Sequence, residues 1–141
     1  MSERLLDFVR AMTRLCDSTG ADEAQLLAQA SPLMRALVAQ DDWLPEAMAV
    51  RQPQGCRQHL LYGDPLDRFS LVSFVWGPGQ KTPIHDHTVW GIIAMLRGAE
   101  FAQRYERSAA GAPLTPSGQE AKLMPGEIEM VSPTLGDIHL V

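Results

Sequence analysis

The strongest constraint on the fold is a series of short, β-rich segments that follows Pro45. Many of these segments are rich in β-branched or aromatic residues, and Gly, Pro or Asp separates most of them. They are RQHLLYG, FSLVSFVWG, VWGIIAML, EFAQRYER, EAKLM, EIEMVSP and DIHLV. Short strands with frequent turns are typical of a sandwich or barrel, and no helical pattern interrupts them as a parallel sheet would require. The polar, breaker-rich stretch 111–118 is predicted to be a loop between strands.

The region before Pro45 has a helical pattern instead. Apolar residues between positions 3 and 17 recur at helical spacing, with Ser2 as a plausible N-cap and Gly20 as a stop. A second helix is predicted over residues 22–30. Ser31-Pro32 then resembles an N-cap followed by proline in the first turn, which predicts a third helix ending near Gln40.

The length and composition indicate one soluble globular domain. With 141 residues the chain can bury a real core, and its net charge of -5 provides no basic surface for nucleic acid or an anionic membrane. No apolar run is long enough to span a bilayer, and the N-terminus lacks the apolar region of a secretory signal. Cys16 and Cys56 form no C-x-x-C pair and no disulfide framework. We therefore expect a cytoplasmic protein that binds neither nucleic acid nor membranes.

Two histidines in the sequence PIHDH are candidates for a metal site. In a strand, residues i and i+2 point to the same face, so His85 and His87 would project together and could hold one ion. The pair alone does not establish a metal site, and the alternative is two surface or turn histidines after Pro83. Asp86, between them, either orients another group or is a solvated residue. A further histidine, His139, lies near the end of the chain in GDIHLV.

The glycines around these histidines form two recognisable patterns. Residues 79–98 read G-x5-H-x-H-x3-G-x6-G, which resembles the first motif of the cupin superfamily, with Gly91 where that motif usually has Glu. Residues 126–139 read G-x6-P-x2-G-x2-H, which resembles the second motif. The resemblance implies a mainly β fold, a cupin double-stranded β-helix or jelly-roll-like barrel. The metal would lie inside it, bound by His85, His87 and His139.

The resemblance also gives an expected organisation of the chain. We expect a single cupin domain over residues 1–141, in which an N-terminal helical segment, 1–45, packs on a barrel formed by residues 55–141.

Gly91 bears on the chemistry of such a site. Three neutral imidazoles leave a divalent ion its full charge, and glycine supplies no fourth, anionic ligand. Three positions of an octahedral ion then stay open, which suits an anionic atom such as a thiolate beside O₂. The residue types alone fit iron, zinc, copper and nickel, and a hydrolytic zinc site is physically possible.

The resemblance becomes more specific over longer blocks. FSLVSFVWGPGQKTPIHDHTVWGIIAMLRGAE together with SPTLGDIHLV resembles the cysteine dioxygenase family, the thiol dioxygenases of the cupin superfamily, from about Arg57 to the end of the chain. This resemblance implies an Fe(II) cofactor bound by the three histidines. It also implies a reaction in which O₂ is added to a small thiol carboxylate, 3-mercaptopropionate or cysteine, to form a sulfinate.

Two positions refine the resemblance. Gly91 excludes the cysteine–tyrosine cross-link of the mostly animal members. Gln58 aligns with the arginine that binds the substrate carboxylate in members specific for cysteine, which resembles the bacterial 3-mercaptopropionate dioxygenase branch. Arg57 is the alternative if the alignment shifts by one residue, and a strand places the two side chains on opposite faces. Glutamine offers only neutral hydrogen bonds, so a second cation further downstream is expected to hold the carboxylate.

The family places a Ser-His-Tyr relay after its third histidine, whereas this sequence stops two residues after His139. We therefore expect a barrel that is truncated at its C-terminus, with the catalytic relay beyond Val141 and weak or no activity from this segment alone. Two alternatives remain. One is a cupin that binds a metal or ligand without catalysis, and the other is a zinc-dependent cupin isomerase or hydrolase. Zinc or nickel could accordingly occupy the site in the protein as isolated.

Overall fold

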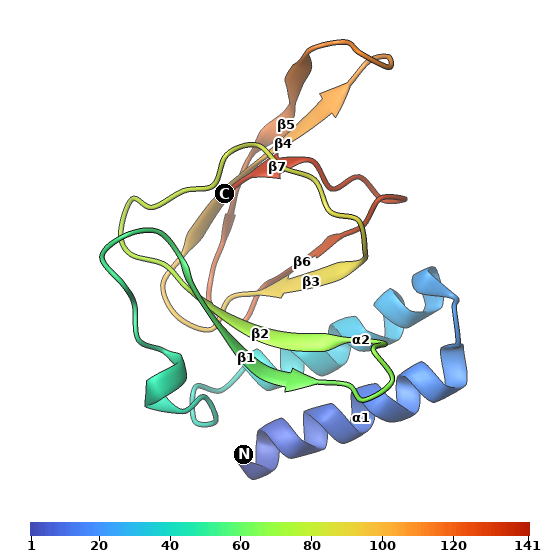
Figure 1. Ribbon diagram of the computed structural model, residues 1–141, viewed down its shortest axis with the longest axis vertical. Helices are drawn as coiled ribbons and strands as arrows, with labels where there is room; N and C mark the ends of the chain where they lie inside the picture. Colours follow the sequence, from blue (N-terminus) through green and yellow to red (C-terminus); the bar gives the residue numbers. More distant parts are fainter. The chain divides into compact units, whose positions relative to one another are not determined.

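The computed structural model describes residues 1–141, in which two helices precede seven strands (Figure 1). The chain divides into two compact units. The first contains residues 1–33 and 41–80, and the second contains residues 34–40 and 81–141. Neither helix is long and apolar enough to cross a membrane.

Helix α1 (Glu3–Thr19) matches the helix predicted for residues 3–17. The Ser2 hydroxyl accepts a hydrogen bond from the Leu5 N–H at 3.3 Å and so caps the first turn. Gly20 ends the helix with φ of 57°, a conformation that glycine adopts without steric cost, and its N–H donates to the Cys16 carbonyl. The apolar residues at helical spacing are buried, as the pattern predicts.

Helix α2 (Glu23–Val38) is one continuous helix, so the prediction of separate helices before and after Ser31-Pro32 is wrong. Asp22 caps it by accepting a hydrogen bond from the Gln25 N–H at 3.0 Å. Ser31 donates its hydroxyl to the Leu27 carbonyl, as serine does inside a helix. Burial explains the continuity, because one apolar stripe runs past the proline and offsets its missing hydrogen bond. Its buried members are Leu26, Leu27, Ala30, Leu37 and Val38.

The strands of the first unit form an antiparallel pair, β1 (Arg57–Gly63) with β2 (Ser70–Val75). The Asp64 carboxylate organises the turn between them, accepting hydrogen bonds from backbone N–H groups and from the Arg68 guanidinium at 2.7 and 3.0 Å. Arg68 also forms an ion pair with Asp17 of α1. The turn of the β1–β2 pair is thereby tied to a helix of the same unit. A short 3₁₀ turn, η1 (Glu46–Met48), precedes β1.

The second unit contains two further antiparallel sheets. One pairs β3 (Gly91–Ala94) with β6 (Ile128–Val131). The other has the order β5-β4-β7, formed by β5 (Leu114–Leu123), β4 (Glu100–Arg107) and β7 (His139–Leu140). Within this unit the β4–β5 hairpin extends away from the β3–β6 pair (Figure 1).

The loop predicted over residues 111–118 is partly strand, which corrects that prediction. Residues from Leu114 onward belong to β5 and pair with β4, with Pro116 opposite Tyr105. Proline has no N–H to donate, and it is tolerated here because β5 is an edge strand whose other side has no partner. A register shift between Ala102 and Arg104 of β4 accommodates the irregular part of β5.

The strands form three separate small sheets, none of which is closed on itself. The structure therefore confirms the coarser expectation, helices followed by antiparallel strands, in a chain that mixes both types of element. A mainly β description fits only loosely, and the cupin barrel and the single-domain organisation stay predictions.

Candidate metal centre

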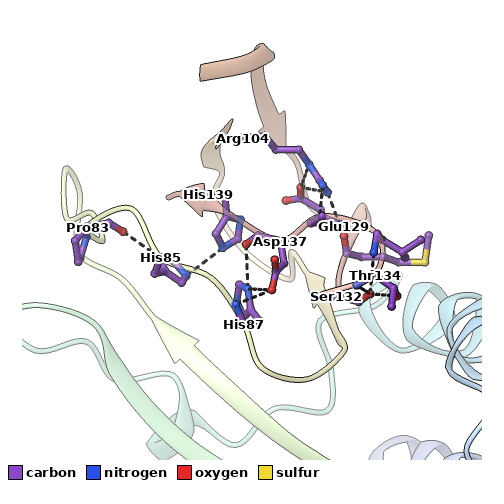
Figure 2. Close-up of polar contacts among 12 residues, drawn as sticks. Pro83, His85, His87, Arg104, Glu129, Ser132, Thr134, Asp137 and His139 are labelled. Atoms are coloured by element: carbon purple, nitrogen blue, oxygen red, sulfur yellow. Dashed lines mark hydrogen bonds and ion pairs between the residues drawn. The ribbon is translucent and has the colours of Figure 1, made fainter. Parts of the chain in front are cut away.

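Three histidines of the second unit converge in space (Figure 2). The candidate ligand nitrogens of His85, His87 and His139 all lie within 4.8 Å of one another. The Nε2 atoms of His85 and His139 are 3.1 Å apart. Metal–imidazole bonds are about 2.0–2.1 Å long, so two nitrogens on one ion lie roughly 3 Å apart. The spacing of this pair therefore suits a single ion, and a small adjustment of His87 completes the set.

Backbone pairing brings two of these residues together from distant parts of the sequence. His139 begins β7 and lies opposite Arg104 on β4. His85 forms a bridge with His139, in which each N–H donates to the other's carbonyl at 2.9 Å. His85 and His87 do not lie on a regular strand, so the predicted same-face projection from a strand is wrong. The loop carrying them is instead held against β7 by the bridge at His85, and both rings still reach the same point.

Hydrogen bonds to carbonyl groups set the tautomers of two of the rings. His85 Nδ1 lies 3.0 Å from the Pro83 carbonyl oxygen, and His87 Nδ1 lies 3.2 Å from the Asp137 carbonyl oxygen. Because a carbonyl oxygen only accepts, each Nδ1 must carry the proton and donate it. Nε2 of both rings then keeps its lone pair, which is the form that binds a metal.

His139 is the most buried member of the cluster, with 2% of its surface exposed. Burial, together with the smaller effects of the neighbouring His85, His87 and Arg104, lowers the pKa of His139 to about 4. The ring is therefore neutral near pH 7. Since only neutral imidazole binds metal, this side chain is ready for coordination without first losing a proton.

The loop before His139 is tightly constrained by polar contacts. The Ser132 hydroxyl accepts hydrogen bonds from the N–H groups of Thr134 and Leu135, both at 3.1 Å. Arg104 donates to the Gly136 carbonyl at 3.0 Å (Figure 2). Arg104 also forms an ion pair with Glu129 on β6. These contacts fix the path of the chain from β6 into β7 and so the position of His139.

Sequence reasoning did not identify Arg104 or Asp137 as residues of this site. The Asp137 carboxylate accepts a hydrogen bond from the His87 N–H at 2.7 Å. Its place two residues before His139, in GDIH, was the available signal. Arg104 gave no signal in the sequence, because only the pairing of β4 with β7 places it opposite His139.

The structure gives Gly91 a packing role. It begins β3 and pairs with Val131 of β6. A β-carbon at residue 91 would approach the Val131 Cγ2 atom to 3.1 Å, closer than ordinary van der Waals contact. Any larger residue at this position would therefore require the Val131 side chain to move. The glycine thus permits close packing of β3 on β6.

Gln58 and Arg57 lie on β1 of the first unit, so neither belongs to the histidine cluster, which the second unit forms by itself. They pair with Phe74 and Val75 respectively and so occupy opposite faces of β1, as predicted. The face of Gln58 also carries Leu60 and Phe74, which are 64% and 53% exposed. The role of Gln58 in substrate binding stays a prediction.

A scan against models of known protein families finds no match for the chain. The identity of the metal can therefore be inferred only from the ligand atoms that the site offers. Three neutral imidazoles suit iron, zinc, copper or nickel, so the residues present fit Fe(II) and zinc alike.

Proposed function

We propose that this protein is a mononuclear non-heme iron thiol dioxygenase, with His85, His87 and His139 as the metal ligands. The observation that carries the proposal is the convergence of three imidazoles with no carboxylate in the cluster. Bound Fe(II) would supply the redox chemistry by which both atoms of O₂ pass to the sulfur of a thiol, RSH + O₂ giving the sulfinate RSO₂⁻ and a proton.

The neutral ligand set supports an anionic substrate. Three imidazoles do not offset the charge of a divalent ion, and a thiolate does so while staying deprotonated near the metal. A β-carbon at residue 91 would lie 3.1 Å from Val131 Cγ2, so the packing disfavours the carboxylate that cupins usually have at this position. The ring tautomers leave the Nε2 lone pairs of His85 and His87 free, so both rings would bind the ion through that atom.

The sequence resemblance supplies the proposed substrate class. It favours 3-mercaptopropionate over cysteine, because Gln58 stands where the cysteine-specific members have an arginine. A glutamine offers only neutral hydrogen bonds and no charged fork for a carboxylate.

The test uses the full-length protein, loaded with Fe(II), and 3-mercaptopropionate, cysteine or cysteamine as the substrate. We expect O₂ consumption that matches sulfinate formation, fastest with 3-mercaptopropionate, and we expect His139→Ala to abolish both. His59→Ala is the matched control, since His59 lies on β1 outside the cluster. Absence of O₂ uptake with all three thiols would contradict the proposal.

Binding of the thiol provides a second readout that needs no turnover. Addition of 3-mercaptopropionate to the Co²⁺-loaded protein should produce a sulfur-to-metal charge-transfer absorption. The His139→Ala variant should lack it.

A zinc-dependent isomerase or hydrolase is the second candidate, because three neutral imidazoles also form hydrolytic zinc sites. Metal analysis of the protein as isolated separates the two. Full zinc occupancy with an activity that persists without O₂ would favour the zinc enzyme. Stable metal binding with neither activity would indicate a protein that binds the metal without catalysis.

A further inference from the structure

We propose that Asp137 is a positioning residue that holds His87 in its metal-binding orientation. The inference depends on the proposed function only in taking the histidine cluster as a metal site. It concerns a residue outside the ligand set, and it would hold for zinc or iron alike.

Asp137 contacts His87 through both its side chain and its main chain (Figure 2). Its Oδ2 atom accepts a hydrogen bond from the His87 N–H at 2.7 Å, and its carbonyl oxygen accepts one from His87 Nδ1 at 3.2 Å. The first contact fixes the backbone of His87, and the second fixes the rotation and the tautomer of its ring. One residue therefore determines where Nε2 of His87 points.

The position of Asp137 in the chain connects two of the candidate metal ligands. It lies two residues before His139, so the same short segment carries one ligand and holds another that is 50 residues away in sequence. The loop of His87 has no regular strand pairing of its own. Without the Asp137 carboxylate, the paired backbones of His85 and His139 would remain, and the backbone of His87 would lose its hydrogen bond to the segment that carries His139.

Asp137 is not placed to be a fourth ligand. Its Oδ2 atom lies 3.9 Å from Nδ1 of His87, on the protonated side of the ring, and it is already accepting the His87 N–H. Only 8% of the residue is exposed. A buried carboxylate that accepts the backbone N–H of a ligand residue orients that ligand.

The experiment measures Co²⁺ affinity by titration of the visible absorption, in wild type and four variants. Loss of a residue that orients a metal ligand typically reduces affinity by about 10–100-fold, and we expect that loss for Asp137→Ala. Asp137→Asn keeps an acceptor but not the charge, so we expect a smaller loss. Asp86→Ala and Asp86→Asn are the matched controls, because Asp86 is an exposed carboxylate in the same loop and its removal changes the net charge equally. Both controls should keep wild-type affinity.

A second readout is the NMR spectrum of the metal-free protein. The short hydrogen bond from the His87 N–H to the Asp137 carboxylate predicts a downfield amide proton, which should move upfield in Asp137→Ala. The Nδ1-protonated tautomer of His87 should persist in that variant, because the backbone carbonyl of residue 137 remains. Both signatures should persist in the Asp86 variants. If Asp137→Ala does not fold, Asp137→Asn carries the same comparison.

The outcomes separate the positioning role from the proposed function. Wild-type affinity in Asp137→Ala, or equal losses in the Asp86 controls, overturns the positioning role and leaves the metal site intact. Failure of the wild-type protein to bind Co²⁺, Zn²⁺ or Fe²⁺ overturns both. Asp137→Ala should bind metal more weakly but oxidise thiols normally at saturating Fe²⁺, because the metal-loaded site then re-forms. That result would support the positioning role of Asp137.

Discussion

At residue 91, a side chain is costly because its β-carbon would lie only 3.1 Å from Val131 Cγ2. The neighbour is a branched side chain on a paired strand, so it has little freedom to move away. Close packing of β3 on β6 therefore favours glycine at this position.

We expect Gly91→Ala to destabilise the protein by about 1–3 kcal/mol through overpacking. The double variant Gly91→Ala/Val131→Ala should lose less unfolding free energy than the two single variants lose together, because the smaller side chain at residue 131 removes the clash. Gly63→Ala is the control, since a β-carbon there meets no atom within 4 Å. Urea unfolding measures wild type, the two single variants, the double variant and the control, and additive losses in the double variant would contradict the packing explanation.

Asp64 determines how the first unit responds to acid. Its hydrogen bonds to Arg68 lower its pKa from 3.8 to about 2. The folded state therefore binds this proton less readily than the unfolded chain does. The resulting stabilisation is fully present above pH 3.8 and is lost as the pH falls from 3.8 towards 2.

We expect Asp64→Asn to lower the free energy of unfolding at pH 7. Between pH 4 and pH 2, the free energy of unfolding should decrease less in this variant than in wild type. Asp67→Asn is the matched control, because Asp67 is an exposed carboxylate in the same turn, and asparagine tolerates its φ of 55°. Urea midpoints across that pH range provide the measurement. Parallel acid profiles for wild type and Asp64→Asn would contradict the role of the Asp64–Arg68 contact.

Among the elements, α2 carries an internal proline, Pro32, that has no N–H to donate to the Ala28 carbonyl. Proline in a helix interior costs about 3 kcal/mol relative to alanine. Pro32 itself is exposed, so its replacement disturbs little packing. We expect Pro32→Ala to raise the thermal midpoint. The rise should correspond to a stabilisation of at most about 3 kcal/mol.

Gln29→Ala, an exposed change in the same helix, is the control for α2 and should leave the thermal midpoint nearly unchanged. A lower midpoint in Pro32→Ala would mean that the ring of Pro32 contributes packing that outweighs the restored hydrogen bond.

The sequence predicts an element well where local pattern and burial agree. In α1 the capping serine, the apolar spacing and the terminal glycine all favour the same helix, and β1 spans the predicted RQHLLYG segment. In α2 and β5 a local proline signal opposes long-range packing or pairing, and the packing prevails. The same limit applies to the site. Motif spacing identified the three histidines, whereas the contacts of Arg104 and Asp137 depend on pairings that no local pattern reveals.

At the scale of the whole molecule, the chain consists of two compact units, and all three histidines belong to the second. A metal that binds only the folded second unit stabilises it by RT ln(1 + [metal]/Kd), about 2.7 kcal/mol at a metal concentration of 100 Kd. Local openings of the first unit do not break the site. Metal binding should therefore affect the two units unequally.

Hydrogen exchange with and without saturating Zn²⁺ tests this expectation. We expect slower exchange in residues 81–141, most of all around His85, His87 and β7, and unchanged exchange in residues 1–33. The His139→Ala variant should show neither effect, because it removes the buried ligand. A uniform rise in protection along the chain would show instead that the two units open together, since ligand binding then stabilises every amide that exchanges through the global transition.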